Sequence, residues 1–140
     1  MTIEARLHRA DGAVTRLTNG KHVWNADVDK TLGSLDLAPD PHDLLDSALA
    51  ACTALTLELY IRRRKIPVTG LHVSVEHVEE NNAQGDVRYH LSCRIAIEGA
   101  EVTDADRQRL LEIAGRCPIH RVLTGEIDIT AGLVEGEIYA

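Results

Sequence analysis

Residues 41–64 limit the possible folds more than any other part of this 140-residue chain. Asp40 suits a helix N-cap, Pro41 suits the first helical position, and Asp43 can complete a capping arrangement three residues after the cap. Apolar side chains then recur at helical spacing, and Pro67 ends the pattern. The segment therefore predicts one helix of roughly 24 residues.

This predicted helix is unusually apolar for its length, and the run Ala48-Leu49-Ala50-Ala51 offers little polar surface on any side. A helix that is apolar on several faces is expected to be buried on several faces. One sheet cannot easily cover it, so we expect a partner chain and hence a homodimer. The apolar repeat consists of Leu45, Ala48, Leu49, Cys52, Leu55, Thr56 and Leu59.

The segments before this helix predict short strands. Turn signals at Asp11-Gly12 and Asn19-Gly20 separate strands at 2–8, 13–18 and 21–25. Residues 26–40 lack a clear period and contain Gly33, Ser34 and Pro39, which predicts a loop.

The segments after the helix predict a hairpin, a second helix and a final strand pair. Alternating apolar residues at 71–75 and 87–97 flank a turn at 81–85. Thr103 and Asp106 begin the second helix, which we expect to reach Cys117 and to end at Pro118. Strands at 126–130 and 134–139 turn near Gly132. The order predicts a single α+β domain over 1–140, with two main helices packed against antiparallel sheets.

The charge and composition of the chain limit the kinds of molecule that it can bind. A formal net charge of −7 repels phosphates, which argues against nucleic acid and anionic lipid. The basic run 62–65 is explained by the preference for cations at a helix C-terminus. We expect no membrane span and no hydrophobic signal region, and therefore a cytoplasmic protein.

The three cysteines differ in their predicted surroundings. Cys52 and Cys117 lie on apolar stripes of two different helices, so both thiols are expected to face one shared space. Such a pair can form a sulfenic acid and then a disulfide, although a lone helical cysteine is more often a small core residue. Cys117 is expected at a helix C-terminus, which disfavours a thiolate and leaves Cys52 as the better nucleophile. Cys93 is expected to pack in the core.

A thiol in the middle of a helix needs a neighbouring cation or hydrogen-bond donor to lower its pKa. His42, His120 and Arg121 are the nearest candidates in the sequence. His42 precedes Cys52 by ten positions, or roughly 15 Å along one helix, so direct contact within the same helix is excluded. The alternative for His42 is an exposed residue of the first helical turn.

Two segments resemble a known family. Residues 41–56 resemble the P-x-[ED]-L-L-x-x-A-L-x-x-C-T-x-x-T signature of OsmC-like proteins, and residues 117–123 resemble their C-P-[VI]-H-x-x-L motif. Gly33 lies in the expected glycine-containing loop, and the resemblance extends over roughly 23–130. It implies an intertwined homodimer with active sites at the subunit interface.

The resemblance also implies an activity, namely the reduction of organic hydroperoxides and, to a lesser degree, hydrogen peroxide. Cys52 matches the peroxidatic cysteine and Cys117 the resolving cysteine, with a dithiol such as a lipoyl group as reductant. No metal and no organic cofactor is implied. The expected role is oxidative-stress defence.

The chain departs from the family pattern at two places. His42 occupies the position of a family Glu, for which Asp43 is a candidate substitute. No Arg lies between Arg16 and Arg62 to match the family Arg, and Arg16 is the candidate for an activating or orienting role. The departures keep open a protein that binds a small hydrophobic ligand or senses redox state with little turnover. A zinc site built from Cys52, Cys117, His42 and His120 is a third hypothesis, which no metal-binding spacing supports.

Overall fold

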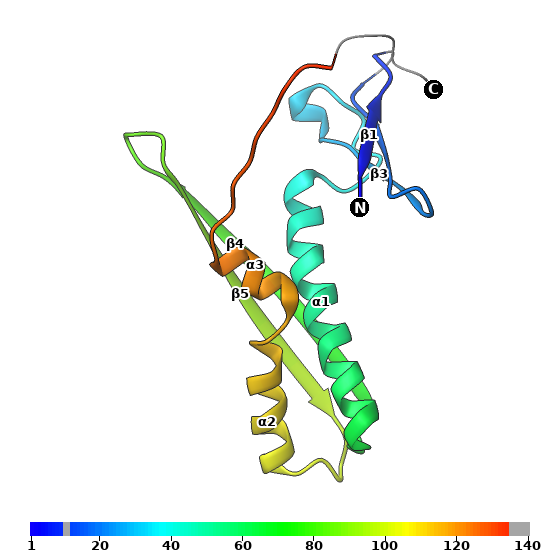
Figure 1. The fold of residues 1–140 in the computed structure, drawn as a ribbon, viewed down its shortest axis with the longest axis vertical. Helices are drawn as coiled ribbons and strands as arrows, with labels where there is room; N and C mark the ends of the chain where they lie inside the picture. The colour runs from blue at the N-terminus through cyan, green and yellow to red at the C-terminus, as the bar shows by residue number, and fades with distance from the viewer. Residues whose placement is uncertain (10–11, 135–140) are drawn as a thin grey trace.

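The computed structural model describes residues 1–9 and 12–134. Figure 1 shows its elements, which are β1 (Glu4–Leu7), β2 (Thr15–Thr18), β3 (Val23–Ala26), the 3₁₀ helix η1 (Lys30–Leu32), α1 (Pro41–Arg64), β4 (Gly70–Asn81), β5 (Val87–Glu98), α2 (Asp104–Ala114) and α3 (Pro118–Thr124). The strands form an antiparallel β1-β2-β3 sheet and an antiparallel β4-β5 hairpin. The predicted α+β class with antiparallel sheets is confirmed.

Helix α1 organises the other elements. It lies along the β4-β5 hairpin and contacts β4, α2 and α3, while the three-stranded sheet lies beyond its N-terminal end (Figure 1). The hairpin pairs Gly70 with Glu98 at its base and Asn81 with Val87 beside the turn. The packing of the hairpin and α2 against α1 therefore fixes the position of the middle of this helix.

Local sequence signals explain both ends of α1. The Asp40 carboxylate accepts from the backbone N–H of Asp43 at 2.8 Å, and the Asp43 carboxylate accepts from the N–H of Asp40 at 3.1 Å. At the other end Lys65 adopts a left-handed conformation after three arginines in the last turn. The predicted helix is confirmed at both ends, and so is the place of the basic run.

The loop before α1 is ordered by buried polar groups. Asp27 and Ser34 are 3% and 5% exposed, and their side chains are hydrogen-bonded to each other. Asp27 also accepts from the N–H of Leu37 at 3.0 Å, and its own N–H donates to the carbonyl of Pro39 at 3.0 Å. These bonds tie the predicted loop to the start of α1, and η1 lies within it.

The apolar core lies between the C-terminal half of α1 and α2. Leu57 and Leu110 are completely buried there, and Ile95 and Ile97 of β5 pack against the cluster from the hairpin. The cluster itself consists of Leu57, Tyr60, Ile61, Leu110, Ile113 and Ala114. It covers one face of α1 only, because Leu55 and Leu59 on the same helix are 63% and 66% exposed in the single chain.

Two predictions about the C-terminal third were wrong. The second helix ends at Ala114, and Pro118 begins a third helix in which Cys117 is the N-cap. Proline is compatible with the first position of a helix as well as with the end of the previous one. Pro118 by itself therefore does not show whether it ends one helix or begins the next. Residues 126–130 form no strand. Most of the predicted strand 134–139 lies outside the described residues.

Helix α1 is the segment that bears on the expectation of no membrane span. By length and composition it is apolar enough to cross a membrane. The same composition is found in helices at the core of globular proteins, and α1 packs against the hairpin and α2 along part of its surface. Part of the apolar surface of α1 is thus buried by other elements of the same chain.

The core assignment predicts a large effect for Leu57→Ala. Removing this fully buried side chain should lower the free energy of unfolding by about 2 to 5 kcal/mol, because burial is lost and a cavity remains. Urea denaturation followed by circular dichroism measures the change. Leu111→Ala is the matched control, since Leu111 is 59% exposed and should change the stability much less. Equal effects would contradict this core.

Candidate active site

The structure brings Cys52 and Cys117 together. Cys52 lies in the middle of α1, and Cys117 caps the N-terminus of α3, which packs against α1. Their thiols interact, and each one shifts the pKa of the other. Cys117 is completely buried and Cys52 is half-buried. Two sulfur atoms from distant parts of the chain thus share one partly enclosed space.

The surroundings of Cys52 favour its thiolate. Burial, the largest influence, by itself raises the pKa, because desolvation disfavours the charged form. Hydrogen bonds from the backbone N–H of Ile119, the thiol of Cys117 and the hydroxyl of Thr56 outweigh burial and bring the pKa below its ordinary value. Cys52 is therefore the more acidic thiol of the pair.

The surroundings of Cys117 favour its protonated form. Burial raises its pKa, and so does its donation to Cys52, whereas the N–H of His120 at 3.3 Å and the hydroxyl of Thr53 act in the opposite direction. The sequence-based reason for its low acidity was wrong, because Cys117 begins a helix instead of ending one. Burial, and not a helix C-terminus, keeps this thiol protonated.

The sequence reasoning missed the donors that surround the two sulfurs. Thr56 follows Cys52 by four positions, so helical spacing alone could have placed its hydroxyl beside the thiol. Ile119 donates through its backbone, which carries no signal in the residue type. Thr53 is 2% exposed and contacts Cys117. The pKa of Cys52 is thus lowered by these donors, and not by the cationic side chains that the sequence suggested.

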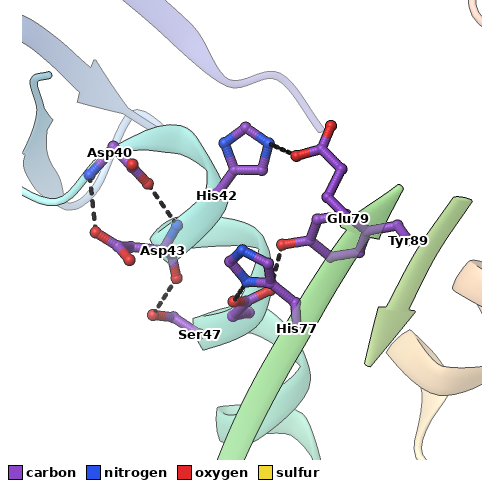
Figure 2. Close-up of polar contacts among 8 residues, drawn as sticks. Asp40, His42, Asp43, Ser47, His77, Glu79 and Tyr89 are labelled. Atoms are coloured by element: carbon purple, nitrogen blue, oxygen red, sulfur yellow. Dashed lines mark hydrogen bonds and ion pairs between the residues drawn. The ribbon is translucent and has the colours of Figure 1, made fainter. Parts of the chain in front are cut away.

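His42 belongs to a different cluster (Figure 2). Its Nε2 lies 3.4 Å from the Glu79 carboxylate, and its ring stacks on Tyr89 with centroids 5.9 Å apart. The Tyr89 hydroxyl donates to Asp46 at 2.9 Å, and Asp46 also pairs with the ring of His77. The cluster joins the first turns of α1 to β4 and β5. The structure therefore does not bring His42 to Cys52.

Burial raises the pKa of Tyr89 to about 12, and the hydrogen bond to Asp46 acts in the same direction. The phenol therefore remains a donor at neutral pH and holds the Asp46 carboxylate. The cluster of His42, Asp46, His77, Glu79 and Tyr89 is a polar clamp between α1 and the hairpin, at the end away from the apolar core.

The remaining candidate side chains also lie elsewhere. Asp43 is occupied by the capping box of α1, and Ser47 donates to its carbonyl at 2.6 Å (Figure 2). Arg16 is exposed on β2, in the sheet beyond the N-terminal end of α1 (Figure 1). His120 touches Cys117 through its backbone N–H only. Within one chain, the groups that lower the pKa of Cys52 are thus Ile119, Cys117 and Thr56.

The structure does not bring the four proposed zinc ligands together. His42 pairs with Glu79 and lies about three turns of α1 away from Cys52, so it shares no ligand set with Cys52 and Cys117 within one chain. Over 1–9 and 12–134, no group of three or more histidine, cysteine, aspartate or glutamate side chains is arranged to hold a metal ion.

The prediction that Cys93 is a buried core residue was wrong. Cys93 is exposed on β5, and its thiol donates a weak hydrogen bond to the Thr53 hydroxyl at 4.0 Å. It lines a cavity of about 420 Å³ between β5 and α3, together with Leu49, His120 and Leu123. A strand residue that faces a helix is left exposed here because the cavity separates the two elements.

The hydrogen bond between the sulfurs predicts a shift in the pKa of Cys52. Cys117→Ala removes a donor to the thiolate, so the pKa of Cys52 should rise. The rate of Cys52 alkylation by iodoacetamide, followed against pH on the Cys52 peptide by mass spectrometry, reports this pKa. The wild-type midpoint should lie below the ordinary value for a thiol. Cys117→Ser retains a donor and should move the midpoint less; identical midpoints in all three proteins would contradict the contact.

Comparisons with solved structures agree with this architecture. An organic hydroperoxide resistance protein from Elizabethkingia anophelis is 25% identical with a TM-score of 0.68, covering 91% of each chain. An OsmC-like protein from Mycoplasma pneumoniae is 20% identical with a TM-score of 0.74, covering 89% of this chain and 86% of its own. The organic hydroperoxide resistance protein OsmC from Legionella pneumophila is 19% identical with a TM-score of 0.68, covering 91% and 93%.

A comparison with curated proteins finds no match. The family model for OsmC-like proteins, in contrast, matches residues 33–132, which include α1, the hairpin, α2, α3 and both paired cysteines. The match covers most of the chain, and the fold agrees with solved members. This chain belongs to the OsmC-like protein family.

Proposed function

We propose that this protein is a thiol peroxidase that reduces organic hydroperoxides and, less readily, hydrogen peroxide in oxidative-stress defence. One observation carries the proposal: α3 packs against α1 and brings Cys117 to Cys52, where neighbouring donors lower the pKa of Cys52. A nucleophilic sulfur and a protonated partner thiol in contact are the two groups that a cysteine peroxidase needs. Solved relatives named organic hydroperoxide resistance proteins support the same reaction.

The chemistry follows from the different protonation of the two sulfurs. The Cys52 thiolate attacks the terminal oxygen of the hydroperoxide, the O–O bond breaks, and the alkoxide takes up a proton to leave as an alcohol. Cys52 is then a sulfenic acid. The Cys117 sulfur attacks it, a disulfide forms, and the hydroxyl leaves as water with the Cys117 proton. A dithiol returns both cysteines to thiols and becomes a disulfide itself.

The partner of this chain is proposed to be a second copy. A folded monomer of 15.4 kDa is expected to expose about 7,000 Å². This chain exposes 11201 Å² by itself. Part of the excess is the apolar stripe of Leu45, Leu55 and Leu59 along α1, and Cys52 borders that stripe. A homodimer that covers the stripe places each active site at the subunit interface.

The proposed reaction also indicates the reductant and the cellular compartment. The proposed reductant is a dithiol of the lipoyl type, and the three free cysteines fit a cytoplasmic, reducing compartment. Neither nucleic acid nor a metal or organic cofactor takes part in the proposed reaction.

A second candidate function is the binding of a small apolar ligand with little turnover. The cavity between β5 and α3, lined by Leu49, Leu91 and Leu123 among others, favours it. The cavity does not include Cys52 among its lining residues, so ligand binding there does not depend on the peroxidatic thiol. The two functions therefore respond differently to substitution of Cys52.

A peroxide-consumption assay separates these functions. With cumene hydroperoxide and dihydrolipoamide, Cys52→Ser should lose turnover by at least about a hundredfold, because the attacking sulfur is gone. Cys117→Ser should consume a stoichiometric amount of peroxide and then slow, because the sulfenic acid has no resolving thiol. Arg63→Gln, at the far end of α1, is the control and should match wild type. Equal rates in wild type and Cys52→Ser would exclude the peroxidase.

The homodimer is tested by Leu55→Glu. A charge in the α1 stripe should dissociate the dimer, because burying an unpaired carboxylate is costly. Sedimentation velocity compares it with wild type and with Leu111→Glu, whose side chain is exposed on α2 and should leave the dimer intact. A monomeric wild-type protein would contradict this assembly.

A further inference from the structure

Cys93 is the one thiol that the proposed reaction does not use, and it lies next to the pair. Its sulfur is 4.0 Å from the Thr53 hydroxyl, and the same hydroxyl donates to the Cys117 sulfur. Thr53 is the chain neighbour of Cys52 and is 2% exposed. The three cysteines of the chain are thus gathered around one side chain of α1, with Cys93 on the hairpin side.

Cys93 also differs from the pair in its access to solvent. Cys117 is completely buried, whereas Cys93 is exposed. Two neighbouring cavities, of about 420 and 190 Å³, have Cys93 in their walls, and both are also lined by Leu49 and His120. Cys52, in contrast, borders the apolar stripe of α1 that a second subunit would cover. The cavity side of the pair is therefore the side left open to a dithiol reductant.

We propose that Cys93 is a third redox-active cysteine, which transfers the disulfide from the buried Cys52–Cys117 pair to the cavity between β5 and α3, where a small dithiol reduces it. The inference rests on the proposed pairing of Cys52 with Cys117. It assigns the two substrates to different sulfurs: peroxide reacts at Cys52, beside the proposed subunit interface, and the dithiol reacts at Cys93, in the wall of the cavity.

The transfer is a thiol–disulfide exchange without net oxidation. Cys93 loses its proton to solvent, and its thiolate attacks the Cys117 sulfur. The Cys93–Cys117 bond forms, the Cys52–Cys117 bond breaks, and Cys52 leaves as a thiolate. The dithiol then attacks the Cys93 sulfur, Cys117 leaves and takes up a proton, and the second thiol of the reductant displaces Cys93 and closes the reductant's own disulfide.

Two features of the site favour this direction. Thr53 contacts both Cys93 and Cys117, so these two cysteines share one neighbouring side chain of α1. The more acidic thiol is the better leaving group in such an exchange, and the donors around Cys52 stabilise its thiolate as it leaves. The exchange therefore restores the peroxidatic sulfur in its reactive form.

The test forms the disulfide without peroxide, so that it does not depend on peroxidase activity. Reduced wild type and Cys93→Ser are oxidised with diamide, alkylated and digested, and their disulfides are identified by mass spectrometry. Wild type should contain Cys93–Cys117 beside Cys52–Cys117, and Cys93→Ser should contain only the latter. Stopped-flow reduction of both by dihydrolipoamide should be slower in Cys93→Ser by about tenfold or more.

The possible outcomes are distinct. A Cys52–Cys117 disulfide as the sole product in wild type, with equal reduction rates in both proteins, would overturn the transfer and leave the peroxidase proposal intact. If diamide forms no Cys52–Cys117 disulfide in wild type and none in Cys93→Ser, both the transfer and the peroxidase proposal would be overturned. Ser92→Ala, at the neighbouring position of β5, controls for an effect of the strand itself and should match wild type. Thermal unfolding of each variant verifies that the fold is retained.

Discussion

The need to cover α1 is the constraint on which the rest of the structure depends. The helix carries apolar or small side chains on almost every face, and each neighbouring element covers a different part of it. The hairpin and α2 enclose Leu57 and Ile61 in an aliphatic core, and α3 covers the turn that holds Cys52. The stripe through Leu55 and Leu59 stays uncovered within one chain, which is why the proposed assembly is a dimer.

The same packing accounts for the different properties of the two paired cysteines. Helix α3 begins beside α1, so its first backbone N–H groups lie near both sulfurs, and the N–H of Ile119 is directed to Cys52. Cys117 is buried beneath them and donates its own proton to Cys52. No charged side chain is needed to create this difference in acidity, because burial and hydrogen bonding act on the two sulfurs in opposite directions.

Helix α1 is held by two different kinds of contact at its two ends. The C-terminal half is held by aliphatic packing around Leu57 and Leu110, and the N-terminal half by the polar clamp, in which Tyr89 and His77 reach Asp46. The cysteine pair lies between the two. A helix fixed at both ends keeps a sulfur in its middle at a constant position relative to α3, and the proposed two-sulfur reaction requires such precise placement.

Short-range signals in the sequence determined the helix α1, the hairpin and the identity of the paired cysteines. Asp40, Pro41 and Asp43 act on their own neighbours, and strand alternation is a property of each segment by itself, so both can be recognised without a fold. Pro118 was ambiguous because proline fits both the end of one helix and the start of the next. The tertiary structure alone decided that His42 meets Glu79, that Ile119 donates to Cys52 and that Cys93 lies open to a cavity. Each of these contacts joins groups that are far apart along the chain, and their meeting depends on how the elements pack, which residue spacing does not encode.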